Sequence, residues 1–243
     1  MLIQSTSVTV NYKKIDSIKK EYINNEEKLK NHFNSGTVLP IPDDAPLEYP
    51  RIMATTHNEH GQLSISPTGT TFRVVYNNGF EQDWGKCSDY LKKRMYSVFS
   101  LLNSFTEDTY EYIGLVSTIL FDDIKNNGTR IIAKNLLKSQ NINDLYDIDV
   151  KFTFVKNEKI FTNITLQNAR IFKQGVNISK AGDMSSKNQI EESVGVILDI
   201  NDRYCFNNDP NYQSNSRVLD ELIECMDDVI NNKLEPLVKK GEL

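Results

Sequence analysis

Two of the chain's three histidines stand close together, in the stretch His57-Asn58-Glu59-His60. Imidazole nitrogens and a carboxylate are good ligands for zinc or nickel, so His57, Glu59 and His60 are candidate metal ligands. In the metalloprotease pattern, however, two histidines four residues apart face one ion from a helix. Here the spacing is three residues, in a stretch that Gly61 ends between two alternating segments. We therefore predict a hairpin turn and no bound metal.

Acidic residues at predicted strand ends are the second candidate, for a metal-dependent phosphodiesterase or nuclease with dispersed carboxylates. Asp122 and Asp123 follow an apolar strand, and Asp199 lies in another. Carboxylates gathered at strand ends can hold Mg²⁺ with few protein ligands. Asp149 and Lys151 have the acid-x-lysine spacing that ends a divided nuclease motif. Turn formation and helix capping are the competing explanation of the strand-end acids, and we favour it.

Motifs of nucleophilic or nucleotide chemistry are missing from the sequence. It has no G-x-S-x-G elbow, no phosphate-binding G-x-x-x-x-G-K-[ST] loop and no dinucleotide-binding G-x-G-x-x-G. The three cysteines, Cys87, Cys205 and Cys225, are odd in number and have no C-x-x-C spacing. They indicate reduced thiols rather than a disulfide framework or a zinc site. No cofactor is predicted.

Composition excludes several further classes. The 243 residues are 39% hydrophobic and 25% charged, with a formal net charge of −5, so bulk electrostatics do not favour a polyanion. Basic residues on one predicted helix, Lys86, Lys92, Lys93 and Arg94, keep nucleic-acid binding open as an alternative. The N-terminal segment lacks the pattern of a signal peptide, and no run approaches the length of a membrane span. We expect a cytoplasmic protein with no membrane contact.

Hydrophobic periodicity predicts an α+β fold in which two halves share one order of elements. Each half reads as strand, helix, three strands and a long helix. In residues 1–107 these are 6–12, 13–33, 51–56, 62–66, 71–76 and 84–105, and in residues 108–243 they are 110–121, 126–139, 149–155, 160–173, 193–200 and 218–234. We predict antiparallel or mixed sheets, each covered by a long helix, in two subdomains of one compact unit. A tandem duplication of a β-α-β-β-β-α unit and one continuous antiparallel sheet both remain open.

Several strings resemble a sporadically distributed family of uncharacterised bacterial proteins of similar length. They are QLSISPTGTTFRVVY, YIGLVSTILFDD, GVILDIND and LDELIECMDDVINNKLEPLV. Members of that family have a histidine in the last helix, where this chain has Asp227 or Asp228. The resemblance implies a bacterial cytosolic protein and carries no activity, cofactor or site residue.

Taken together, these patterns favour a non-enzymatic interaction protein that binds another protein or its own copy. It would be an accessory factor of a mobile-element or defence system. Unpaired edge strands, or the polar loop 174–189, are the segments expected to recruit the partner. The metal-dependent phosphodiesterase and the nucleic-acid-binding protein are the alternatives.

Overall fold

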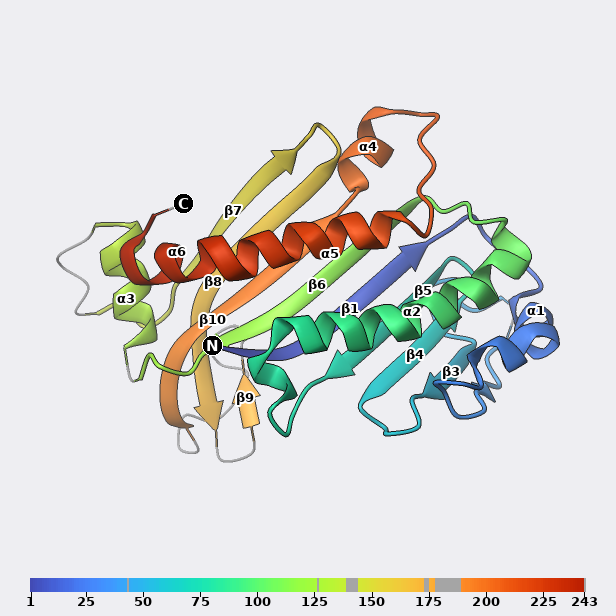
Figure 1. The fold of residues 1–243 in the computed structure, drawn as a ribbon, viewed down its shortest axis with the longest axis horizontal. Helices are drawn as coiled ribbons and strands as arrows, with labels where there is room; N and C mark the ends of the chain where they lie inside the picture. Colours follow the sequence, from blue (N-terminus) through green and yellow to red (C-terminus); the bar gives the residue numbers. More distant parts are fainter. Residues whose placement is uncertain (43, 126, 139–143, 173–174, 178–188, 243) are drawn as a thin grey trace.

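The computed structural model describes residues 1–42, 44–125, 127–138, 144–172, 175–177 and 189–242. It is an α+β structure (Figure 1). The strands are β1 (Leu2–Asn11), β2 (Thr37–Val38), β3 (Ile52–Thr55), β4 (Gly61–Ser66), β5 (Gly69–Val75), β6 (Tyr112–Phe121), β7 (Asp149–Lys156), β8 (Ile160–Phe172), β9 (Gly175–Asn177) and β10 (Gln189–Asn201). The helices are α1 (Ile18–Asn25), the 3-10 turns η1 (Glu26–Leu29) and η2 (Phe80–Gln82), α2 (Trp84–Thr106), α3 (Gly128–Leu136), α4 (Arg203–Asn208), α5 (Val218–Asp228), the π-turn η4 (Val229–Lys233) and α6 (Leu234–Lys240).

A single antiparallel sheet unites the two halves of the chain. The described strands pair in the order β2-β3-β4-β5-β1-β6-β10-β8-β7, and β9 pairs with β8. β1 and β6 join the halves along their length, from Leu2 opposite Leu120 to Asn11 opposite Tyr112. The prediction of separate sheets was therefore wrong, and the continuous sheet is the architecture. Pairing between strands about a hundred residues apart leaves no local pattern, so the sequence did not reveal it.

The core lies between one face of the sheet and the helices. Figure 1 shows both long helices, α2 and α5, in front of the same face. Thr6, Val8 and Val10 of β1 point to that side and are buried, whereas Ser7 and Thr9 alternate to the other face and are half-buried. In β1, one side of the strand is thus packed into the core, and the other side carries small polar residues.

The two long helices begin and end differently. Asp83 caps α2 and accepts a hydrogen bond from the Lys86 amide (3.1 Å). Pro236 lies at the third position of α6. The irregularity precedes it: the Leu234 amide donates to the Val229 carbonyl, five residues back, in the π-turn η4. The ring of Pro236 has no amide hydrogen to continue a regular ladder, which explains the widened turn next to it.

None of the described helices combines the length and the apolar character that crossing a bilayer requires. Of the polar loop predicted over 174–189, residues 175–177 form β9 and residue 189 begins β10. Residues 174 and 178–188 lie outside the described residues.

Candidate functional site

The stretch His57 to His60 is the turn of the β3–β4 hairpin. Both ring nitrogens of His57 have protein partners: Nδ1 lies 3.0 Å from the Asn34 side-chain oxygen and Nε2 lies 3.0 Å from the Lys30 carbonyl. Glu59 has a positive φ of 59°, and its amide donates to the Thr56 carbonyl (2.8 Å). These contacts fix a tight turn. In the described part of the chain, no three His, Cys, Asp or Glu side chains gather as a metal site would require.

The acidic candidates lie at separate places on the sheet. Asp149 shares a row with Gln167, Gly195 and Leu120. It is therefore three strand spacings, ~14 Å, from the end of β6 that Asp122 and Asp123 follow. Asp122 pairs with the terminal amine of Met1, and Asp123 pairs with Lys239 (2.8 Å).

Asp199 and Lys151 do not bring these acids together. Asp199 lies inside β10, where the side chains of Asn163 and Asn201 donate to its oxygens (3.4 and 2.8 Å). Lys151 lies on β7, on the same side as Asp149, at an exposed position. The structure thus leaves the five residues of the nuclease alternative dispersed.

Most cations of the α2 candidate surface have partners. Lys86 pairs with Asp83 (3.3 Å) and Lys92 pairs with Asp220 (3.1 Å). The Arg94 guanidinium lies 3.3 Å from the centroid of the Tyr90 ring. Because these three cations have partners within the molecule, the structure gives less support to a nucleic-acid-binding surface on α2.

A buried carboxylate, Asp202, joins separate segments within the second half of the chain. It is fully buried and accepts hydrogen bonds from the Ile113 amide (2.7 Å), the Tyr212 hydroxyl (2.7 Å) and the Ser214 hydroxyl. Burial raises the pKa of Asp202 above its usual range, although these donors oppose the rise. Its hydrogen bonds tie the start of β6 to the segment before α5. We assign Asp202 a structural role, because its contacts link the start of β6 with residues 212 and 214.

At the outer margin of the first half, β3 is covered by the two-residue strand β2 and the residues around it. β2 pairs with β3, the Asn34 amide donates to the Thr55 carbonyl (2.8 Å), and the Leu39 amide donates to the Arg51 carbonyl (2.8 Å). Arg51 is 1% exposed, and its guanidinium donates to carbonyls of the proline-rich connector at Tyr49, Ala45 and Pro46. The connector therefore covers the backbone edge of β3.

Among the described residues, nothing pairs with the outer margin of the second half. β7 is the last strand in the order, and no described strand pairs with its outer edge. The Ile148 carbonyl accepts from the Asn168 amide (3.4 Å), so the residues at 150, 152 and 154 direct their backbone groups toward β8. Asp149, Lys151, Thr153 and Val155 consequently direct their backbone amides and carbonyls outward. An eight-residue strand thus offers a ladder to another chain.

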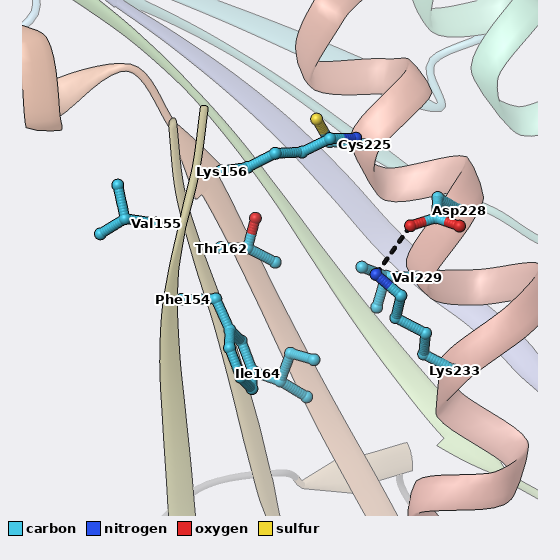
Figure 2. A pocket seen from close by; sticks show the side chains of 9 residues that line it. All are labelled: Phe154, Val155, Lys156, Thr162, Ile164, Cys225, Asp228, Val229 and Lys233. Carbon is cyan, nitrogen blue, oxygen red and sulfur yellow. Dashed lines mark ion pairs between the residues drawn. The ribbon is translucent and has the colours of Figure 1, made fainter. Parts of the chain in front are cut away.

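An apolar groove adjoins this open edge. It has a volume of about 310 Å³ and lies between β7 and β8 on one side and α5 and the π-turn on the other. Figure 2 shows Phe154 and Ile164 on the sheet side, facing Val229. The full lining, which we call the β7 groove, is Phe154, Val155, Lys156, Thr162, Ile164, Cys225, Asp228, Val229 and Lys233.

The rim of the β7 groove is charged. Asp228 and Lys233 form an ion pair of 2.8 Å, drawn as a dashed line in Figure 2. Hydrogen bonding to Lys233, together with the Asn232 side chain and the charge of Lys156, keeps the pKa of Asp228 below its usual value. Phe154 is 42% exposed and Val155 43%. The site therefore combines an unpaired backbone edge, an apolar floor and a polar rim, which suits the binding of an extended chain.

Comparison with protein-family models gave no match, and neither did comparison with curated protein sequences.

Part of this site could be found from the amino-acid sequence. Asp149 and Lys151 were candidates for a divided nuclease motif. In the structure they are two residues on the outward-facing positions of β7. The alternation of residues 149–154 predicts the strand, and the apolar Val155 is the residue that breaks it. The groove is not visible in the sequence, because it depends on where α5 crosses the sheet.

Proposed function

We propose that this chain is a non-enzymatic interaction protein that binds an extended protein segment along β7. The observation that carries the proposal is the open edge of β7 beside the β7 groove. Main-chain hydrogen bonds to Asp149, Lys151, Thr153 and Val155 would supply affinity. The groove would accept an apolar side chain of the bound segment, because alternate residues of an added strand face the helix side.

The contrast with β3 supports this assignment. Natural sheets cover or charge their edges to prevent unwanted pairing, and the connector at β3 does so. β7 has no described segment over it and, besides the charged residues Asp149, Lys151 and Lys156, keeps two large apolar residues, Phe154 and Val155, at its exposed end. A margin left open in a molecule that closes the other one is typical of a binding surface.

Two further points belong to this proposal. The order of strands outward from the β1–β6 pair, β5-β4-β3 on one side and β10-β8-β7 on the other, supports an origin by tandem duplication of residues 1–107 and 108–243. The three free cysteines support a cytoplasmic location.

The test is a single substitution, Thr153→Pro. The Thr153 amide points away from β8, so proline removes an outward donor without breaking the β7–β8 ladder. We expect native mass spectrometry of the tagged protein to show a complex, with itself or with another protein, that this variant loses. Ile23→Ser is the matched control, because Ile23 is 59% exposed on α1, far from β7 in the fold. Complexes that persist in the folded Thr153→Pro variant would overturn the proposal.

A further inference from the structure

The segment around β7 is complementary to itself. Residues 144–156 read DLYDIDVKFTFVK, acidic at the start and basic at the end with apolar residues between. Two copies running antiparallel place the acidic part of one beside the basic part of the other. The large apolar residues of this segment that the structure leaves most exposed are Leu145 (39%), Tyr146 (63%), Phe154 (42%) and Val155 (43%).

We infer that the occupant of the β7 edge is β7 of a second copy, paired antiparallel about a two-fold axis at Val150. This inference rests on the proposed function and names its partner. In this register Asp149 lies opposite Lys151 of the second copy, twice in the dimer. Ile148 lies opposite Phe152, and Tyr146 lies opposite Phe154, again twice each.

Backbone geometry limits the registers. Residues directly opposite in an antiparallel ladder both direct their backbone groups to the partner or both direct them away. Asp149, Lys151, Thr153 and Val155 must therefore oppose one another, and a two-fold axis must pass through a residue position. Few registers remain, and they differ in their charge pairs.

Charge selects the register at Val150. An axis at Lys151 places Lys151 opposite itself, and an axis at Asp149 places Asp149 opposite itself. Like charges directly opposite destabilise a ladder. An axis at Phe152 pairs Lys151 with Thr153 and gains no ion pair. The axis at Val150 gives two Asp149–Lys151 pairs.

The apolar contacts of this register extend the β7 groove. Tyr146 lies along β8, since its carbonyl accepts from Arg170 (3.2 Å) and the Arg170 guanidinium lies 4.9 Å from its ring centroid. Tyr146 of the second copy would then cover Phe154, which lines the groove. The aromatic pair removes from water the two most exposed rings of this margin.

The experiment is a charge-swap complementation by analytical ultracentrifugation. We expect the full chain to sediment as a dimer. Asp149→Lys and Lys151→Asp each turn both ion pairs into repulsions and should raise the dissociation constant roughly tenfold or more. A mixture of the two variants should form a heterodimer, and the double variant Asp149→Lys/Lys151→Asp should recover dimerisation.

Control variants and the possible contrary results distinguish the self-pairing of β7 from the proposed function. Glu224→Lys and Lys93→Asp make the same changes of net charge at exposed positions on α5 and α2 and should leave the dimer intact. Charge variants that dimerise like the original chain would overturn the register. A monomer that binds a different protein, lost in Thr153→Pro, would overturn the self-pairing and leave the proposed function standing. A monomer with no such partner would overturn both.

Discussion

The two outer margins of the sheet solve the same problem in opposite ways. At β3, the chain adds β2, lays a proline-rich connector over the strand and anchors it with the buried Arg51. At β7, no described strand covers the edge, and a groove separates the outer strands from α5. In this molecule, covering an edge takes a dedicated segment and a buried anchor. Where the described chain supplies neither, the margin is available to another chain.

The largest expected contrast is in aromatic packing at the two margins. Phe33 is 2% exposed and packs edge-on against Phe72 with ring centroids 5.4 Å apart, whereas Phe154 is 42% exposed. Phe33→Ala should lower the free energy of unfolding by about 3–5 kcal/mol because it leaves a cavity. Phe154→Ala should lower it by less than about 1 kcal/mol in the monomer. Urea unfolding measures both free energies, and equal losses would contradict the difference in packing between the two margins.

A second expected effect concerns the anchor of the closed margin. Arg51→Met keeps the aliphatic stem but leaves the carbonyls of Tyr49, Ala45 and Pro46 without their donor. We expect a loss of about 2–4 kcal/mol in the free energy of unfolding. Limited proteolysis should cut the connector of this variant faster than that of the original chain. An unchanged cleavage rate would mean that Arg51 does not hold the connector on β3.

The smallest expected contrast is between the starts of the two long helices. The Asp83 side chain caps α2, whereas Arg217 at the N-cap of α5 makes no side-chain capping bond. Asp83→Ala should therefore cost about 1 kcal/mol and Arg217→Ala less than about 0.5 kcal/mol. Thermal unfolding of the two variants ranks them, and a larger loss for Arg217→Ala would contradict the contrast.

Local patterns predicted local structure well. The apolar spacing of Trp84, Leu91 and Met95 marked α2, and the alternation on either side of His57 marked the β3–β4 hairpin. These features depend on residues near one another in the sequence. The prediction of a helix over residues 13–33 was too long, since α1 ends at Asn25 and continues only as the short turn η1.

Features that depend on residues far apart in the sequence could not be predicted. The two halves meet through the pairing of β1 with β6. Both sequences alternate as strands do, but the alternation does not show which strand pairs with which. The β7 groove depends on where α5 packs against β6 and β10 and on the π-turn η4, and neither follows from residues that are close in the sequence. The acid-x-lysine spacing of Asp149 and Lys151 is visible in the sequence. Only the structure places the two residues on a strand edge that no described strand pairs, where we propose that they bind a partner strand.

The π-turn bears on how the last helix evolved. A π-turn carries one residue more than a regular turn, so it is the structural form of a one-residue insertion. Downstream of it, Leu234, Leu237 and Val238 are buried on the same stripe as Leu222 and Met226. A regular helix would have rotated them by about 100° out of that stripe. Relatives that lack one residue between Val229 and Lys233 should therefore keep the same apolar stripe while losing the bulge that forms one wall of the groove.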